Sequence, residues 1–116
     1  MVKGHQLSLE GSWAVETLAV GGELVGPLDG GKPLTLDVDG DQVSGSSGLN
    51  RFMGSMSEEK VFSTLATTRM AGPEALMAQE AVFLAHLESA DSIEVSDSGR
   101  FLLADGLIVL TLVPAS

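Results

Sequence analysis

The stretch PEALMAQEAVFLAHLES, residues 73–89, decides the fold class because it is the one segment with the hydrophobic period of a helix. Pro73 suits the first turn of a helix, where its missing N–H costs no hydrogen bond. Glu74 follows it and suits the positive end of the helix dipole. The apolar residues Leu76, Phe83, Leu84 and Leu87 form one stripe, with Met77 beside it. We predict one α-helix over residues 73–89.

On both sides of this helix, short runs alternate apolar and polar residues between turns, which is typical of antiparallel hairpins. Asp39-Gly40 and Asp105-Gly106 are dipeptides suited to tight hairpin turns. The last run, 107–113, is apolar at both parities, so we expect it to be covered on both faces. The predicted strands span residues 9–20, 34–38, 42–46, 51–56, 61–67, 93–96, 100–104 and 107–113, with a short extended piece at 23–25.

The predicted fold class is α+β. About seven or eight antiparallel strands should form a sheet curled into a partly open barrel, with the one helix (about 73–89) packed against it. A chain of 116 residues, 44% of them apolar, fits one domain with a real core. We expect a single domain over residues 8–115, preceded by an N-terminal tail over residues 1–7.

The charge balance excludes two classes of partner. Sixteen acidic side chains face six basic ones, giving a net charge of −10, so a nucleic-acid backbone or an anionic membrane surface would be repelled. Solubility alone explains the acidity, and a basic protein partner is the alternative. The most apolar stretch, residues 101–113, is shorter than the ~20 residues of a membrane span. We expect a monomer.

The absence of cysteine excludes disulfides, thiolate metal sites and cysteine nucleophiles. Residues 1–6, MVKGHQ, contain no apolar core of a secretory signal. The expected compartment is therefore the cytoplasm by default, or the cell envelope if a leader has been removed.

Few residues suggest chemistry. The acidic run at 37–41 resembles a calcium loop, but its twelfth position is Gly48 instead of an acidic residue, which favours a polar hairpin turn. His5 and His86 are the two imidazoles, too few for a transition-metal site. The Gly-rich run 45–48 lacks the lysine of a phosphate loop. We expect no catalytic residue, no cofactor and no metal, and hence no enzyme.

Glu80 is the most informative charged residue. It lies within the apolar stripe between Leu76 and Phe83, where an ionised group is costly unless it is paired. Arg69, just before the helix, is the favoured partner and Arg51 the second. The alternative is an edge position with the carboxylate in water. We predict a structural, partly buried carboxylate tied to Arg69.

Two motifs resemble the signatures of the META domain, the HslJ-like family. VSGSSGLNRFMG (43–54) looks like Gly-x-x-Gly-Cys-Asn with a Gly four residues after the Asn, and TTRMAG (67–72) looks like Thr-x-Met-Ala-Cys. The resemblance covers residues 9–113. The motif positions that we take as structural are Trp13, Gly45, Gly48, Asn50, Arg51, Gly54, Thr68, Arg69, Met70 and Glu80.

The two cysteines of the family pattern are replaced by Leu49 and Gly72, so we expect these positions to be neighbours in space. No redox role of relatives can apply here. The resemblance implies a small β-rich domain with one helix, related to heat-shock-associated bacterial envelope proteins and virulence-associated proteins of a protozoan parasite. It brings no catalytic residues. The motif glycines would permit positive φ or close backbone approach, and Asn50 would cap free backbone groups.

Two functions remain open. The first is a non-enzymatic, stress-associated accessory or interaction protein with an unknown protein partner. The alternative is a carrier of an apolar small molecule, held in a cavity lined by side chains such as Phe62, Phe83 and Leu110. A filled core with an exposed apolar patch would favour the interaction protein.

No set of histidine and acidic residues has the spacing of a closed metal site, so removing metal should not change stability. We expect a chelator to leave the thermal midpoint unchanged in calorimetry. A fall of several degrees would show that the acidic turn at 37–41 holds a cation.

Overall fold

The computed structural model describes residues 8–57 and 59–115; the predicted tail 1–7, with His5, lies outside them. Ser8 and Leu9 have helical backbone. The elements that follow are β1 (Gly11–Val20), β2 (Glu23–Val25), β3 (Thr35–Asp39), β4 (Gln42–Ser46), β5 (Arg51–Ser55), β6 (Ala66–Thr67), α2 (Glu74–Ser89), β7 (Ser92–Val95), β8 (Arg100–Ala104) and β9 (Leu107–Pro114).

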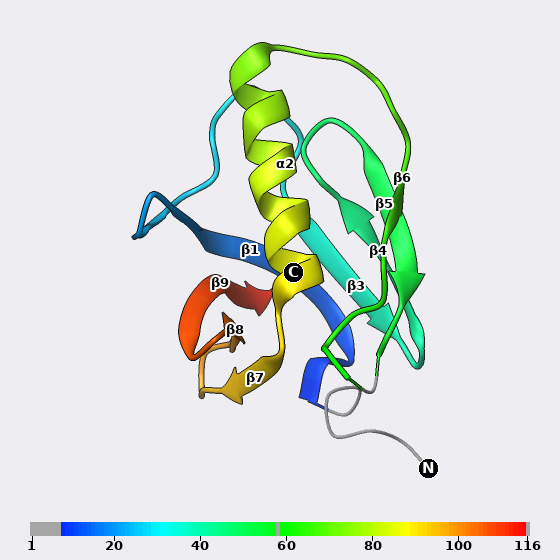
Figure 1. The fold of residues 1–116 in the computed structure, drawn as a ribbon, viewed down its shortest axis with the longest axis vertical. Helices are drawn as coiled ribbons and strands as arrows, with labels where there is room; N and C mark the ends of the chain where they lie inside the picture. Colours follow the sequence, from blue (N-terminus) through cyan, green and yellow to red (C-terminus); the bar gives the residue numbers. More distant parts are fainter. Residues whose placement is uncertain (1–7, 58, 116) are drawn as a thin grey trace.

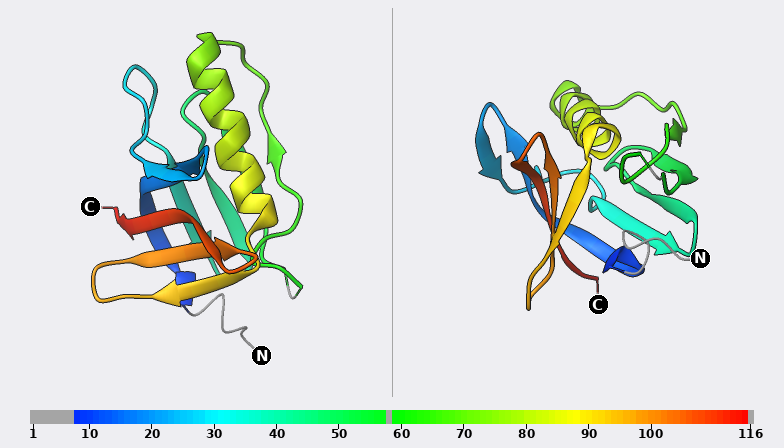
Figure 2. Two further views of the ribbon diagram at one scale, coloured as in Figure 1. Left: turned by 60° about the vertical axis from the view of Figure 1, so that its left-hand side comes forward. Right: turned by 60° about the horizontal axis from the view of Figure 1, so that its bottom comes forward.

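The strands form one nine-stranded antiparallel sheet in the order β6-β5-β4-β3-β1-β9-β8-β7, with β2 paired to the end of β1. The sheet curls without closing into a barrel, and α2 lies across its open side (Figure 1; Figure 2, left). The predicted α+β class is therefore confirmed. The long, bulged β1 allows the curl because it pairs with β3 and β9 and then continues into the hairpin with β2.

The two hairpin turns predicted at Asp39-Gly40 and Asp105-Gly106 are confirmed. Asp105 and Gly106 join β8 to β9 with φ of 51° and 79°, the left-handed values that a two-residue turn requires. The acidic run at 37–41 is the β3–β4 hairpin, in which Asp39 pairs with Gln42. Strand β9 is buried at both parities over 109–112, as its composition predicts.

Several element boundaries differ from the prediction, most of them by one residue. The first strand starts at Gly11, because Leu9 belongs to a helical turn. The predicted strand 61–67 shrinks to β6 and one bridge between Met56 and Phe62, because the Val61 N–H donates to the Ala90 carbonyl after the helix instead of to a strand. The helix begins at Glu74.

The core lies between the inner face of the sheet and α2. The rings of Phe52 on β5 and Phe83 on α2 meet edge to face, with centroids 5.7 Å apart. The helix buries Leu76, Gln79, Phe83 and Leu87. Met77, predicted beside the apolar stripe, is 44% exposed, and the buried polar residue Gln79 was not predicted.

Trp13 on β1 belongs to the same core, away from the contact between Phe52 and Phe83. Its ring is buried, and its Nε1 donates to the Leu9 carbonyl at 2.8 Å. The Arg100 guanidinium lies 4.8 Å from the ring centre and donates to the Ser8 and Gly99 carbonyls. Trp13 therefore fastens the start of the described chain to β8.

Gly45 in β4 is a position where any side chain would collide with the neighbouring strand. A Cβ there would lie 2.2 Å from the Thr35 carbonyl oxygen and 2.7 Å from the Phe52 ring. Gly45→Ala should therefore lower the free energy of unfolding by about 3 kcal/mol, as measured in urea, because the packed strand pair cannot yield freely. Gly26→Ala is the control: its Cβ would meet only the Glu16 carbonyl oxygen at 4.0 Å, so the change should stay within about 1 kcal/mol. Equal losses would contradict the close approach at Gly45.

Candidate functional site

Asn50, in the loop between β4 and β5, is the centre of a polar network among the motif residues. Its Nδ2 donates to the Met70 carbonyl (3.2 Å) and to Glu80 Oε2 (2.8 Å). Its Oδ1 accepts from the Met70 N–H (2.7 Å) and the Thr68 hydroxyl (3.0 Å). Both hydrogens and both lone-pair sites of this buried amide are used. Asn50 thus joins the β4–β5 loop, the segment before the helix and α2.

The partner predicted for Glu80 is wrong. Its Oε2 accepts from the Ser47 hydroxyl at 2.5 Å and from Asn50, and within the described chain no ion pair joins it to Arg69 or Arg51. Both arginines are exposed, whereas Glu80 is half-buried. Two neutral donors from the facing loop bind one oxygen of the carboxylate, and both guanidinium groups belong to exposed residues. Glu80 is a structural carboxylate held by hydrogen bonds.

The remaining motif residues also have structural environments. Thr68 pairs with the backbone of Arg51, whose N–H donates to the Thr68 hydroxyl at 3.0 Å. Gly48 has φ of +96°, which favours glycine. A Cβ at Gly54 would lie 2.7 Å from a methyl group of Leu65. The motif glycines therefore allow tight turns and close packing, as predicted.

Leu49 and Gly72, which stand in place of the two motif cysteines, are neighbours. A Cβ on Gly72 would lie 2.6 Å from Leu49 Cδ2, so the leucine fills the space that a second side chain would need. The prediction that these positions meet in space is confirmed. Their sizes are complementary: a large residue at one position goes with glycine at the other.

The structure brings half of the predicted site residues to one shallow cleft of about 260 Å³. It is lined by Asn50, Thr67, Thr68, Arg69, Met70, Ala71, Met77 and Glu80. The amide, the hydroxyl and one carboxylate oxygen are already hydrogen-bonded to one another or to backbone. The cleft contains no histidine to form an acid–base pair with the carboxylate. This arrangement is suited to holding the fold together.

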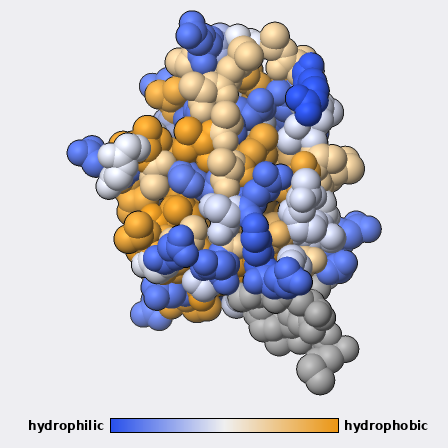
Figure 3. All heavy atoms as spheres, in the orientation of Figure 1, coloured by the Kyte–Doolittle hydropathy of each residue, from blue (hydrophilic) through white to orange (hydrophobic). Residues whose placement is uncertain are grey.

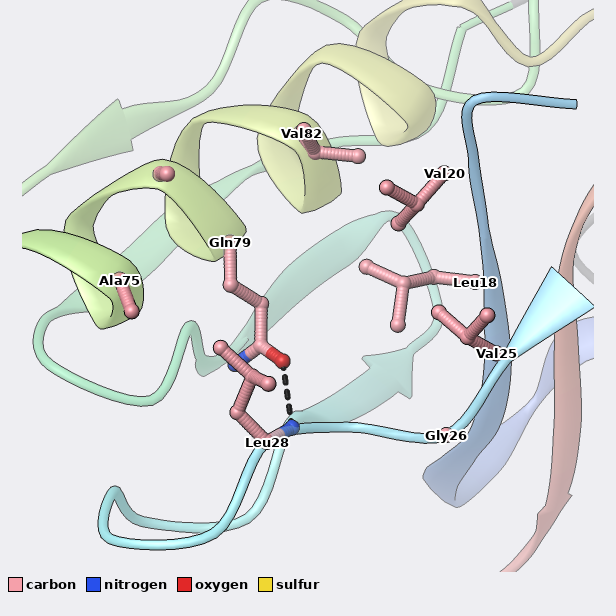
Figure 4. A pocket seen from close by; sticks show the side chains of 9 residues that line it. Leu18, Val20, Val25, Gly26, Leu28, Ala75, Gln79 and Val82 are labelled. Atoms are coloured by element: carbon pink, nitrogen blue, oxygen red, sulfur yellow. Dashed lines mark hydrogen bonds between the residues drawn. The ribbon is translucent and has the colours of Figure 1, made fainter. Parts of the chain in front are cut away.

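A second cavity, of about 290 Å³, is an apolar groove between α2 and the β1–β2 hairpin (Figure 4). Sequence reasoning missed it. Its lining is apolar apart from one amide and consists of Leu18, Val20, Val25, Gly26, Leu28, Ala75, Ala78, Gln79 and Val82.

The groove exists because two hydrogen bonds fasten its walls while small residues leave the middle open. Gln79 Oε1 accepts from the Leu28 N–H at 2.7 Å, which holds the loop after β2 against the helix (Figure 4). About two turns later, His86 Nε2 lies 2.6 Å from the Ala19 carbonyl oxygen of β1. Before Gln79 the helix presents Ala75 and Ala78 to the groove, and their methyl groups are too small to fill it; Val82 lies between the two hydrogen bonds.

The lining of the groove exposes apolar side chains to solvent. Val20, Val25 and Leu28 are 46%, 38% and 49% exposed; Leu24, 44% exposed, pairs with Ala19 and therefore lies on the opposite face of the β1–β2 hairpin. Figure 3 shows apolar residues gathered beside the helix on the side of the β1–β2 hairpin. The run VGGELVGPL, residues 20–28, has Glu23 as its one charged residue, a signal that could have indicated an exposed apolar patch.

In the part of the chain that the structure describes, side chains fill the place expected for a carrier's internal cavity. Phe62, Phe83 and Leu110, its expected lining, are at most 2% exposed and belong to the packed core. Across residues 8–57 and 59–115, no three His, Asp or Glu side chains converge as a metal site would require. In the same described part of the chain, no helix is long and apolar enough to cross a membrane.

The Asn50 network predicts that substitutions of Asn50 and Glu80 have non-additive effects on the free energy of unfolding. Asn50→Ala removes four part-buried hydrogen bonds at once, so it should cost about 3 kcal/mol of unfolding free energy. In a urea double-mutant cycle, Asn50→Ala and Glu80→Ala should couple by about 1 kcal/mol or more.

Arg69→Ala is the matched control for this cycle. It should change stability by no more than about 0.5 kcal/mol and should be additive with Glu80→Ala. Strong coupling between Arg69 and Glu80 would contradict the structure, because it would mean that the two side chains interact.

Comparison with known proteins gives a consistent result. The family model described as the META domain matches residues 5–115. An NMR structure of a protein from Burkholderia xenovorans superimposes with a TM-score of 0.77 at 30% identity, covering 97% of this chain and 86% of the other. A second NMR structure, with a TM-score of 0.63 and 22% identity, covers 97% of this chain and 95% of its own and shows the same fold. No curated protein matches the chain. Motifs, fold and family model agree, and the chain belongs to the META domain family.

Proposed function

We propose that this META domain is a non-catalytic binding domain that recognises an apolar segment of a partner protein in the groove between α2 and the β1–β2 hairpin. The observation that supports it is the half-open apolar groove, whose lining leaves the side chains of Val20, Val25 and Leu28 exposed. Contiguous apolar surface of this kind marks interaction sites on soluble domains. The stress association of relatives belongs to the proposal as its biological setting.

The polar groups near both clefts support a binding function over catalysis. A general acid or base needs a titratable group free to reach the substrate. In the groove, the one polar side chain is the neutral amide of Gln79, whose oxygen already accepts a hydrogen bond. In the motif cleft, Glu80 is engaged by Ser47 and Asn50. Neither arrangement supplies an activated nucleophile.

A carrier of a small apolar molecule is the second candidate, and the volume of the groove favours it. Ligand pockets begin at about 300 Å³, close to the 290 Å³ found here. The groove, however, is open to solvent, and Val20, Val25 and Leu28 in its lining stay 46%, 38% and 49% exposed. Pockets for small molecules bury most of the surface of their ligand, whereas a protein segment can lie in an open groove. The apolar surface therefore suits a protein partner better.

Replacing the groove residues with neutral polar residues of similar size should remove partner binding while leaving the fold intact. We expect the double variant Val25→Thr/Leu28→Asn to retain at least tenfold less partner than the wild type in pull-downs from the source cell, because both side chains line the groove and are partly exposed. Leu107→Asn, at a 71% exposed leucine in β9, should bind as the wild type does.

Native mass spectrometry of the purified protein distinguishes the two candidates. A bound apolar small molecule that is lost in the double variant, together with unchanged protein capture, would replace the partner proposal with the carrier. Equal capture by wild type and double variant would place the interaction elsewhere on the surface.

A further inference from the structure

We infer that the segment bound in the groove is cationic: its apolar side chains enter the groove while flanking lysine or arginine side chains meet an acidic rim. This inference rests on the proposed function and specifies the chemistry of the partner. Three observations carry it, namely the charges beside the groove, the positions of the basic residues and the net charge of the chain.

Acidic residues border the groove on each of its walls. Glu23 lies in β2 just before the exposed Leu24, Asp29 directly follows Leu28 in the loop, and Glu74 opens α2 next to Ala75. All three carboxylate-bearing residues are exposed. An apolar segment that fills the groove would therefore bring its neighbouring residues within reach of these side chains.

One basic residue, Lys32, lies near this rim, because its carbonyl oxygen and the Gln79 amide both come within 4 Å of a Cβ built on Gly48; the three carboxylates outnumber it. Of the lysine and arginine residues that the structure describes, none lies within three positions of a residue that lines the groove; they are Lys32, Arg51, Lys60, Arg69 and Arg100. Arg100 is engaged with Trp13 at the other end of the core. With a net charge of −10, the chain as a whole attracts cations and repels anions.

These charges disfavour anionic occupants and give neutral ones no advantage. An anionic fatty acid or an acidic peptide would fit the apolar lining but would meet the repulsion of the rim. A neutral apolar molecule would gain nothing from the carboxylates, so its binding would not depend on salt. For a cationic segment, the rim should speed association and select the partner, while the apolar contacts supply most of the affinity.

The experiment uses three synthetic twelve-residue peptides as probes of the intact protein, followed by fluorescence anisotropy. One contains leucine and lysine, the second has each lysine replaced by glutamate, and the third has each leucine of the first replaced by serine. The leucine–lysine peptide should bind at least tenfold more tightly than either of the others. Its affinity should fall roughly fivefold between 50 and 300 mM salt, because exposed ion pairs are screened.

Charge-reversal variants test whether the rim is responsible. Glu23→Lys/Asp29→Lys should weaken binding of the leucine–lysine peptide about tenfold and flatten its salt dependence, since the reversal turns attraction into repulsion. Asp97→Lys in the exposed β7–β8 turn, which lines no part of the groove, should change affinity less than twofold. Circular dichroism and urea unfolding confirm that each variant is folded.

The possible outcomes distinguish a failure of the cationic preference from a failure of the proposed function. If Val25→Thr/Leu28→Asn abolishes binding but the rim reversal has no effect, the groove binds apolar segments and the cationic preference is overturned. If both rim and control reversals weaken binding equally, the peptide responds only to net charge, and the inference is again overturned. If Val25→Thr/Leu28→Asn leaves binding unchanged, the proposed function fails together with the inference.

Discussion

The hydrogen bonds of one buried amide, that of Asn50, set the position of α2 against the sheet. The segment between β6 and α2 has little ladder to join, so its backbone groups need another partner. Asn50 supplies one by accepting from the Met70 N–H and donating to the Met70 carbonyl, as a neighbouring strand would. The same amide donates to Glu80 on the helix. A loop, a linker and a helix are thereby held by a single side chain, and a buried polar group in this position is costly to leave unpaired.

The groove is a consequence of this arrangement. Glu80 and the adjacent Gln79 lie about 100° apart around the helix axis, given 3.6 residues per turn. They therefore contact different parts of the fold: Glu80 binds the β4–β5 loop, and Gln79 binds the loop after β2. With Phe83 packed on Phe52 in the core, the helix cannot rotate to close the space over the β1–β2 hairpin. What stabilises the motif side of the helix also keeps the other side open.

Local patterns predicted the helix, the hairpins and the fold class, because periodicity and turn dipeptides act over a few residues. Contacts across the chain were harder to predict. Arg69 seemed the natural partner of Glu80 because it is near in sequence, yet the donors are Ser47 and Asn50, 33 and 30 residues away. The groove was missed for the same reason, since its walls come from β1, β2 and α2. The neighbouring positions of Leu49 and Gly72 were predicted correctly, because two residues that depart together from one pattern carry information about contact.

The separation of the motif residues from the groove bears on how the fold can serve different partners. None of the motif positions, such as Asn50 or Glu80, lines the groove, and the groove residues, such as Val25 and Leu28, lie outside both motifs. Side chains that hold the scaffold and side chains that would contact a partner can therefore change independently. In this chain the motif residues account for the Asn50 network, while a partner at the proposed site would contact the hairpin and the face of α2 that lines the groove. Function has to be argued from that face, because the shared motifs are accounted for by structure.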